Sequence, residues 1–364
     1  MNQKELTCLN LGTTLDHLAN LDPRGYGVCN ILYPAARKAM GEPLSMHAAK
    51  ALVEKIKEND LVYIITGFIL PTHKVAEMDG IVSSMLLARA LVKAFHAKPI
   101  IICPIENKIA VEKLSFVCGL HLYETVEEVM EYPISMGVIP FTKNILNAQS
   151  QSNEILEHGL PAMAISIEAP GANAYGVYHN AIGMNVSELE AKSDVLYQTL
   201  QKLHVPTIAI GDLGNEIGMG TIKEHVEAYI PYAQKSACKC SCQGGIVAAT
   251  KADYLITATV SDWGCYAMIA ALAYLKRNKD IMQNEELEKE AVITASRCGM
   301  VDMTGWLIPA IDGMGMRMNL SIVNLMRDCM KYSMELEETC ITWFEEVEKL
   351  GFFEKVSYGE GRIL

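Results

Sequence analysis

Residues 61–103 read LVYIITGFILPTHKVAEMDGIVSSMLLARALVKAFHAKPIIIC, an apolar run, a polar loop, an apolar stretch of helical length and a second apolar run. The runs at 61–66 and from Pro99 have the length of strands, whereas 81–96 is predicted to be helical. A strand buried on both faces is apolar throughout, and two parallel strands need a crossover helix between them. The stretch therefore predicts a parallel βαβ unit.

The same alternation continues along the chain and predicts an α/β fold, with a mostly parallel sheet flanked by helices. Further helices are predicted at residues 45–59, 106–119, near 126, 144–157, 187–203, 221–229 and 263–275, and further strands at 134–140, 162–168, 206–211 and 253–261. No repeat or proline-rich linker divides the chain, so we expect residues 1–364 to form a single unit. The polar stretch 148–153 is a candidate connection between two lobes, and 319–364 is expected to form a helical C-terminal segment.

Composition excludes several classes of protein. The 364 residues carry a net charge of −12, half of them are apolar and 20% are charged, which excludes a disordered chain. The acidic balance argues against nucleic acid as a partner. Uncharged runs reach only about 13 residues, too few for a membrane-spanning helix, so we expect no membrane partner.

The N-terminus lacks a basic region followed by an apolar block, and it carries Glu5 and Asp16. We therefore expect no export signal. The eleven cysteines are an odd number scattered through apolar stretches, as in reduced intracellular proteins, so we expect the cytoplasm. The composition is compatible with a homo-oligomer and leaves that question open.

Four apolar runs lead directly into loops rich in glycine, amide and carboxylate side chains. These loops read GFILPTHKVAEMDG after residue 66, EAPGANAYGVYHN after 167, GDLGNEIGMG after 210 and SDWG after 260. The carboxyl ends of parallel strands lie at one edge of the sheet, where ligands of α/β proteins bind. We therefore expect the active site at this edge.

The loop GDLGNEIGMG stands between a predicted strand and a predicted helix, yet it matches neither glycine-rich nucleotide motif, so no nucleotide cofactor is expected. It places Asp212 and Glu216 close together without a lysine or arginine, which favours a cation: Mg²⁺, Mn²⁺ or a substrate ammonium. In the alternative interpretation Asp212 caps the helix and Glu216 completes the cap. Asn215 between them suits a left-handed backbone or a ligand contact.

Three further carboxylates belong to these loops. Glu77 and Asp79, two residues apart, can reach one point from an irregular backbone, although incidental surface acids explain them equally well. Glu168 ends an apolar strand, where a carboxylate is costly unless it is paired or solvated, so a functional role is favoured.

The same loop as Glu168 contains Tyr178, His179 and Asn180, which supply hydrogen-bonding groups. His179 is either a general acid or base, or a solvated loop histidine.

Cys238, Cys240 and Cys242 follow a C-x-C-x-C pattern. Zinc sites normally use C-x₂-C pairs, and no second cysteine pair lies nearby in the sequence. Zinc binding there is therefore the less favoured interpretation.

Taken in order, the motifs resemble the D-glutamate cyclase-like C-terminal domain family over about residues 22–330. They are DPRG at 22, PLS at 43, TGF at 66, E-x-D-G at 77, IEAPG at 167, Tyr178, Asn180, GDLGNEIGMG at 211, VSDWG at 260, TGW at 304 and IDG at 311. Three residues depart from the family pattern, which typically has threonine at Met78, glycine at Leu213 and asparagine at Asp262, and the segment after IDG reads MGMR where Leu-Pro is usual.

The resemblance implies a lyase that converts D-glutamate to 5-oxo-D-proline with loss of water, so the substrate would be a small acidic amino acid. The predicted catalytic residues are Asp212, Glu216, Glu77 and Asp79, and a divalent metal, Mn²⁺ or Mg²⁺, would be held by Asp212, Glu216 and Glu77. The predicted substrate-binding residues are Arg24, Glu168, Tyr178, Asn180, Asn215 and Asp262, with Arg24 as a clamp on the α-carboxylate.

Two other functions fit the same residues. A Mg²⁺- or Mn²⁺-dependent phosphohydrolase would use Asp212, Glu216 and Glu77, but these loops offer few cations for a phosphate. A non-catalytic metabolite-binding protein is suggested by the departures at Met78, Leu213 and Asp262.

Overall fold

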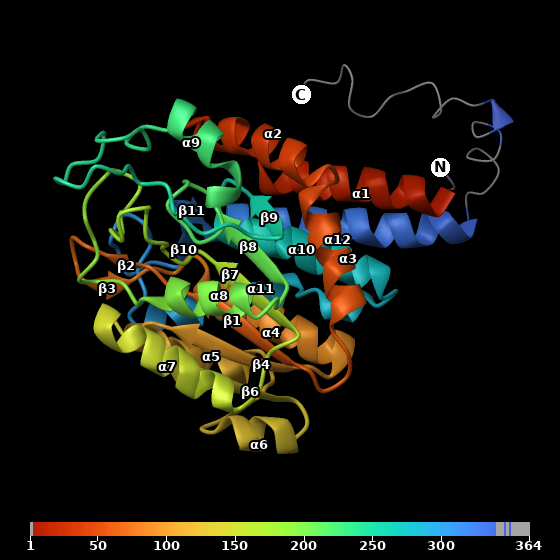
Figure 1. Cartoon of the computed structure of the whole chain (residues 1–364). Helices are drawn as coiled ribbons and strands as arrows, with labels where there is room; N and C mark the ends of the chain where they lie inside the picture. Colours follow the sequence, from red (N-terminus) through yellow and green to blue (C-terminus); the bar gives the residue numbers. More distant parts are fainter. Residues whose placement is uncertain (1–2, 340–345, 347–348, 351–364) are drawn as a thin grey trace.

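The computed structural model describes residues 3–339, 346 and 349–350, and its centre is a seven-stranded sheet in which every pair of neighbours is parallel (Figure 1). In spatial order the strands are β5 (His121–Tyr123), β6 (Ser135–Pro140), β4 (Lys98–Cys103), β1 (Leu61–Thr66), β7 (Met163–Ile167), β8 (Thr207–Gly211) and β9 (Tyr254–Thr257). The predicted α/β fold with a parallel sheet is therefore confirmed.

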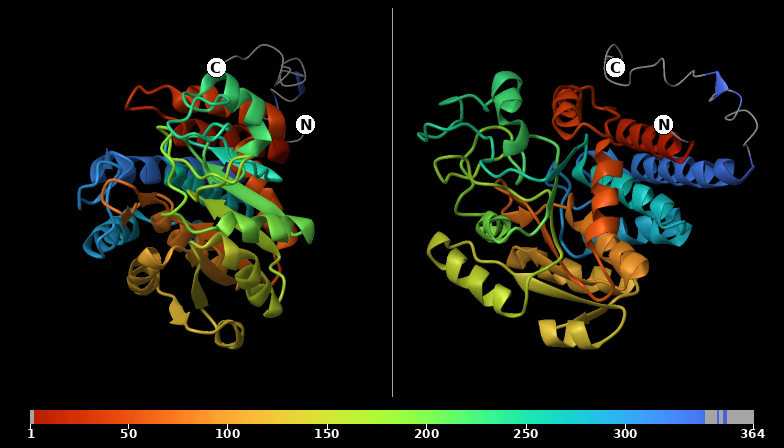
Figure 2. Two further views of the ribbon diagram at one scale, coloured as in Figure 1. Left: turned by 60° about the vertical axis from the view of Figure 1, so that its left-hand side comes forward. Right: turned by 45° about the vertical axis from the view of Figure 1, so that its right-hand side comes forward.

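Helices cover both faces of the sheet (Figure 2). One face carries α1 (Gln3–Ala19), α3 (Leu44–Lys55), α4 (Ile81–Phe95), α5 (Lys108–Val117), α10 (Ser261–Leu275), α11 (Glu285–Arg297) and α12 (Met316–Thr339). The other carries α6 (Val126–Glu131), α7 (Ile145–Glu157) and α8 (Ser193–Lys202). Helix α2 (Val28–Met40) packs against β9, and α9 (Lys223–Tyr229) contacts α2. None of the helices in the described part of the chain combines the length and apolarity required to cross a membrane.

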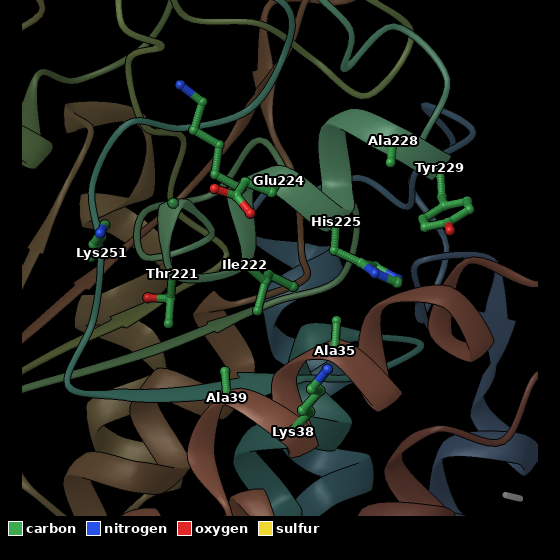
Figure 3. Close-up of a pocket in the computed structure, with 12 residues that line it drawn as sticks. Ala35, Lys38, Ala39, Thr221, Ile222, Glu224, His225, Ala228, Tyr229 and Lys251 are labelled. Atoms are coloured by element: carbon green, nitrogen blue, oxygen red, sulfur yellow. The ribbon is translucent and has the colours of Figure 1, made fainter.

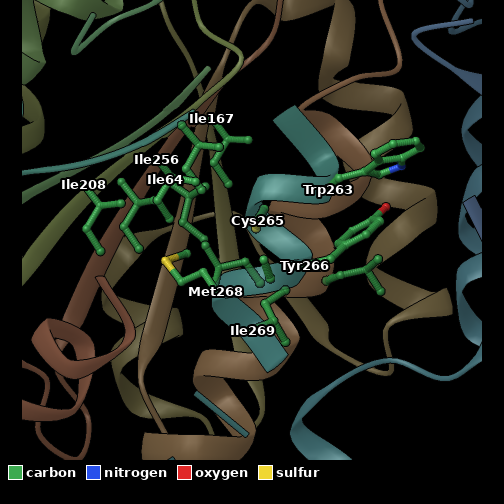
Figure 4. Packing of buried hydrophobic residues seen from close by; sticks show 14 of the residues in the cluster. Ile64, Ile167, Ile208, Ile256, Trp263, Cys265, Tyr266, Met268 and Ile269 are labelled. Carbon is green, nitrogen blue, oxygen red and sulfur yellow. The ribbon is translucent and has the colours of Figure 1, made fainter. Parts of the chain in front are cut away.

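The central strand β1 shows why these apolar runs become strands. Val62 and Ile64 join the core under α4 and α10, whereas Tyr63 and Ile65 join the core under α7 and α8. The alternation of side chains along a strand sends neighbouring residues to opposite cores, so both faces must be apolar. Figure 4 shows the first core, in which Met268 of α10 lies near Ile64 and Ile208 of the sheet, whereas Trp263 and Tyr266 project from the other side of the helix.

The strand order places a topological switch at the centre of the sheet. After β1 the chain continues to β4 on one side, and after β7 it continues to β8 on the other. Because β1 and β7 are neighbours, the loops that follow them diverge and leave a crevice at their carboxyl ends, the usual ligand position in such folds.

Several expected elements end elsewhere. Residues 187–192 precede helix α8 instead of belonging to it, because the Lys192 ammonium donates to the main-chain oxygens of Ser187 and Glu190 and holds a turn there. The stretch 148–153 lies inside α7, so it is not a connection between lobes, and its polar residues belong largely to the exposed side of that helix. Helices α1, α2 and α11 and strand β5 were not predicted. The predicted C-terminal helix corresponds to α12 as far as Thr339, and most of its remainder lies outside the described residues.

Asp16 anchors the N-terminus of α3. Its carboxylate accepts hydrogen bonds from the main-chain N–H groups of Leu44 and Ser45, at 2.6 and 2.9 Å, and from the Ser45 hydroxyl at 2.6 Å. It is a buried helix cap supplied by another helix, α1.

Replacing this cap should destabilise the fold. Asp16→Ala leaves two buried amides of α3 without their acceptor, and the free energy of unfolding should fall by about 2 kcal/mol. Urea unfolding followed by circular dichroism measures the change. The control Glu54→Ala removes an exposed carboxylate from the same helix and should change stability by less than about 0.5 kcal/mol; an equal loss in the two variants would contradict the capping role.

Candidate active site

Main-chain hydrogen bonds join the loops that follow β1, β7 and β8. Gly67 N–H donates to Glu168 O at 3.2 Å, and Glu168 N–H donates to Ile210 O at 3.2 Å. Gly171 N–H donates to Asn215 O, and the loop after β1 is tied to Val301 through Met78 N–H. The loops predicted to converge at this edge therefore form one surface.

Seven carboxylates meet at this surface and form what we call the carboxylate cluster. Its members are Glu77, Asp79, Glu168, Asp212, Glu216, Asp262 and Asp312, all of them buried. Burial first, and neighbouring carboxylates second, raise the pKa of Glu77, Asp79, Glu168 and Asp212 well above their ordinary values. The cluster therefore favours protons or another cation on its oxygens.

Asp79 and Asp262 cap each other's helices. The Asp79 carboxylate accepts from the N–H groups of Ser261 and Asp262 at the start of α10, at 3.1 and 2.8 Å. The Asp262 carboxylate accepts from Gly80 and Ser83 N–H at the start of α4, at 2.9 and 3.2 Å. Two motifs about 180 residues apart thus fix the two helices against one another.

Glu216 fixes the shape of the glycine-rich loop after β8. Its two carboxylate oxygens accept from the main-chain N–H groups of Asp212, Leu213 and Gly214, at 3.2, 2.8 and 2.7 Å. Asp212 at the start of the loop is different, because its Oδ1 is buried without a hydrogen-bond partner. Glu216 holds the loop, and Asp212 retains a free acceptor.

Glu168 has a left-handed backbone, with φ of +43°, which is unusual for a residue with a side chain. Its carboxylate accepts from the Ser261 hydroxyl at 2.6 Å. Gly80 packs directly against it: a Cβ at Gly80 would lie 2.6 Å from the Glu168 Cβ. The glycine of the E-x-D-G motif is therefore required by this close approach.

Arg24 is the basic side chain that the described structure brings into an ion pair with the cluster. Its Nη1 lies 2.5 Å from Asp312 Oδ2, and its two Nη groups donate to the main-chain oxygens of Asp312 and Thr259. Its Nε is buried without a partner. Much of the guanidinium is thus already engaged by the protein, which leaves Nε available to a ligand.

A cavity of about 310 Å³ opens beside the cluster, within the size range of small-molecule sites. It is lined by Phe68, Leu70, Pro71, Thr72, His73, Glu77, Glu168, Asn180, Ala181, Ile182, Met184, Leu213, Asn215, Met303, Thr304, Gly305 and Asp312. Carboxyl groups, amides and apolar side chains therefore face one cavity at the carboxyl ends of β1, β7 and β8.

Four predicted site residues line this cavity, namely Glu77, Glu168, Asn180 and Asn215. Asn215 donates from Nδ2 to His179 O at 3.1 Å, and its Oδ1 is buried without a partner. Three predicted substrate-binding residues, Arg24, Tyr178 and Asp262, do not line the cavity, and neither do the predicted catalytic residues Asp79, Asp212 and Glu216. The Tyr178 hydroxyl donates to Asp194 inside a small apolar core, and Asp262 is fully buried at the helix ends.

The three departures from the family pattern have different surroundings. Leu213 lines the cavity, Met78 is fully buried in the main core, and Asp262 caps α4. Of the three, only Leu213 lines the cavity that would hold a ligand.

Two groups of carboxylates offer one oxygen each within 4.8 Å of one another: Asp79, Asp212 and Asp312, and Glu168, Asp212 and Glu216. Asp212 belongs to both. The predicted trio of Asp212, Glu216 and Glu77 is not such a group, because Glu168 takes the place of Glu77, which lies on the cavity wall. All-oxygen ligands suit Mg²⁺ or Mn²⁺, and the unpartnered Asp212 Oδ1 is the donor best placed for one.

A second, larger hollow of about 750 Å³ lies between α2 and α9 (Figure 3). Lys38, Glu224, His225 and Lys251 line it, and none of the carboxylate cluster does. Its size exceeds that of the cavity beside the cluster, but it lacks convergent buried carboxylates.

Sequence reasoning did not single out Asp312 or Glu190. Asp312 belongs to the IDG motif and has φ of +47°. Glu190 is buried, accepts from Ile69 N–H at 3.1 Å, and has its pKa raised by burial to about 8. The IDG motif was a usable signal for Asp312, whereas Glu190 stands among ordinary polar residues with no signal of its own.

The protein is thus an α/β protein with an acidic cavity at the carboxyl ends of its parallel strands. Residues 15–327 match the family described as D-glutamate cyclase-like, C-terminal, and the chain belongs to that family. A curated relative is the mitochondrial D-glutamate cyclase of Homo sapiens, 28% identical over 272 residues. The matched region is 72% of this chain but only 38% of the human protein.

The Asp79–Asp262 pair predicts a pH-dependent stability. Burial raises the pKa of Asp262 to about 6, so the folded protein holds the Asp262 proton more tightly than the unfolded chain does. The protonated side chain therefore adds to the free energy of unfolding below the pKa of the unfolded chain, and this contribution is lost as the pH rises through about 6. Asp262→Asn keeps an acceptor for the α4 amides without the charge. At about pH 8 this variant should be more stable than the parent by about 1–3 kcal/mol, and at about pH 4 the difference should vanish.

Urea unfolding at both pH values measures this difference. The control Asp328→Asn changes an exposed aspartate of α12 and should show no such trend. If the parent protein were as stable as Asp262→Asn at about pH 8, the buried negative charge of Asp262 would not destabilise the fold, and this prediction would be wrong.

Proposed function

We propose that the chain is a small-molecule lyase that converts D-glutamate to 5-oxo-D-proline and water, with the carboxylate cluster and its cavity as the active site. The carrying observation is the cavity in which Glu77, Glu168 and Asp312, with raised pKa values, face an amide and apolar side chains. Family membership and the name of the human relative support this choice of reaction.

The proton balance of this reaction matches the cluster. The α-ammonium must lose two protons as it becomes an amide N–H, and the γ-carboxylate loses one oxygen as water. The two protons leaving nitrogen are therefore the two that the departing oxygen needs. Burial raises the pKa of the Glu77, Glu168 and Asp212 carboxyl groups well above the ordinary value, so these groups bind protons more readily than exposed carboxylates. They can therefore receive protons from the amine and deliver them to the departing oxygen.

The unpartnered polar atoms suggest how the substrate is oriented. Asn215 Oδ1 and Asp212 Oδ1 are buried acceptors, which suit the N–H groups of an amine. Arg24 Nε is a buried donor, which suits a carboxylate. We assign the ammonium to the Asp212 and Asn215 side and keep the α-carboxylate clamp at Arg24. These two contacts would hold the Cα end of the substrate, and the γ-carboxylate would fold back toward the amine for ring closure.

A divalent cation fits the same residues. Asp212 with Glu168 and Glu216, or with Asp79 and Asp312, would hold Mn²⁺ or Mg²⁺. Such an ion would supply Lewis acidity toward the γ-carboxylate oxygen. With an ion on Asp212, the positioning of the amine and the transfer of its protons would fall to Asn215 and the cavity carboxyl groups.

The phosphohydrolase alternative is less compatible with the site. A phosphate ester would meet several carboxylates and one arginine that Asp312 already engages. A non-catalytic metabolite-binding protein would use the same cavity without turnover, so an activity assay separates that alternative from the lyase.

The deciding experiment is incubation of the purified protein with D-glutamate or L-glutamate, with Mn²⁺ or with a chelator, while NMR follows 5-oxoproline. We expect turnover of the D-enantiomer. Asp212→Asn removes a proton acceptor and should lower kcat about 10²–10⁴-fold. Glu188→Gln, an exposed acid of the loop between β7 and α8, is the control and should retain the parent kcat.

No 5-oxoproline from either enantiomer, together with hydrolysis of a phosphate ester, would replace the lyase by the phosphohydrolase. D-glutamate binding by calorimetry without turnover would replace it by the metabolite-binding protein. An unchanged kcat in Asp212→Asn would exclude Asp212 as the proton acceptor.

Leu213 gives a prediction about specificity. Its side chain lines the cavity where the family typically has glycine, so it should contact the methylene groups of the substrate. Leu213→Ala removes apolar contact and should raise KM for D-glutamate about tenfold while kcat changes little. Leu203→Ala, at an exposed position, is the control; a large fall in kcat with unchanged KM in Leu213→Ala would contradict a binding role.

A further inference from the structure

A second cluster of possible metal ligands lies behind one wall of the cavity and contains no carboxylate. Cys238, Cys240 and Cys242 come from the segment between α9 and β9, and His179 comes from the loop between β7 and α8. One ligand atom from each of the four residues lies within 4.8 Å of every other. We propose that these residues bind one structural Zn²⁺ ion.

The distances support a tetrahedral site. Cys238 Sγ lies 3.5 Å from Cys240 Sγ and 3.4 Å from Cys242 Sγ, and His179 Nε2 lies 3.1 and 3.5 Å from the sulfurs of Cys240 and Cys242. A tetrahedron with edges of about 3.5 Å has its centre about 2.1 Å from each corner, close to Zn–N and Zn–S bond lengths. A disulfide would instead bring two sulfurs to about 2 Å and leave the third aside.

The ligand types select the ion. Three thiolates and one imidazole in a tetrahedral arrangement suit Zn²⁺, and four protein ligands leave no open position for a substrate or water. Binding would release the three thiol protons and leave His179 neutral. The site is therefore expected to stabilise structure, with no part in the reaction.

The surroundings resemble a built metal site. His179 is fully buried with Nε2 directed at the sulfurs, which excludes the solvated loop histidine considered from the sequence. Asn173, also buried, donates from Nδ2 toward Cys242 Sγ at 3.5 Å and to Gly245 O at 2.8 Å. Such outer contacts orient metal ligands and help to stabilise thiolate charge.

The long segment between α9 and β9 explains why an ion would be needed there. Residues 230–253 contain no helix or strand, and a loop of that length needs side-chain contacts or a bound ion to hold one conformation. An ion shared with His179 would tie this segment to the loop that supplies Asn180, Ala181, Ile182 and Met184 to the cavity. His179 O also accepts from Asn215 Nδ2, so the tie extends to the cavity amide.

The test begins with the full-length parent protein, purified without added metal and dialysed. Elemental analysis should find about one zinc per chain. A thiol-specific mercurial should release that zinc, whereas an ion held only by carboxylates would not respond. Replacement by Co²⁺ should give a thiolate-to-metal charge-transfer band and the strong visible bands of tetrahedral cobalt.

Variants assign the ligands. Cys240→Ser and His179→Ala should each lower the zinc content to a small fraction of the parent value. Cys298→Ser, at a half-exposed cysteine outside the cluster, should keep the full content. Asp212→Asn should also keep it, so loss of activity through the carboxylate cluster is distinguishable from loss of zinc.

Three outcomes would overturn the proposal: a parent protein that binds neither Zn²⁺ nor Co²⁺ after reduction, octahedral oxygen-ligated cobalt spectra, or a zinc content unaffected by both ligand variants. The first two are measured on the parent chain, so they stand even if a variant fails to fold.

Discussion

The structure depends on how seven buried carboxylates are accommodated at one edge of a parallel sheet. Three of them, Asp79, Glu216 and Asp262, accept main-chain amides and so determine the positions of two helices and a loop. Buried carboxylates without such donors are expensive, and their charge is avoided by protonation or by a bound cation. The amide-bound carboxylates therefore form a rigid frame, and Glu77, Glu168, Asp212 and Asp312 are the members to which we assign the proposed chemistry.

The topology explains why this cluster is at the centre of the sheet. β1 and β7 are neighbours whose following segments leave in opposite directions, so both loops are free to bend over the crevice between them. Glu168 enters that crevice with a left-handed backbone, and Gly80 allows the β1 loop to touch it. The cavity is thus a consequence of strand order combined with two exceptional backbone positions.

The fold was largely predictable because its strands are apolar on both faces, as LVYIIT at β1 illustrates. The convergence of the acidic loops followed from parallel topology. The distinct roles of the acids could not be predicted, since Glu216 binds three amides and Asp212 binds none through Oδ1, a difference set by tertiary geometry. Asp262 illustrates the same limit: its motif indicated a substrate contact, but its oxygens are used at the start of α4.

The cluster of three cysteines and His179 could not be recognised from the sequence for a related reason. Its fourth member, His179, precedes Cys238 by 59 residues, so no local spacing rule connects them. The wall of the cavity formed by residues 180–184 has no regular secondary structure, and it is fixed on one side through Asn215 and on the other through the cysteine segment. Irregular segments lack the repeating main-chain hydrogen bonds of helices and strands, so the wall at residues 180–184 needs contacts with other segments to hold its conformation. The amide-bound carboxylates fix the side of the cavity next to the sheet. The proposed zinc ligands lie where they would fix the opposite wall, residues 180–184, through His179.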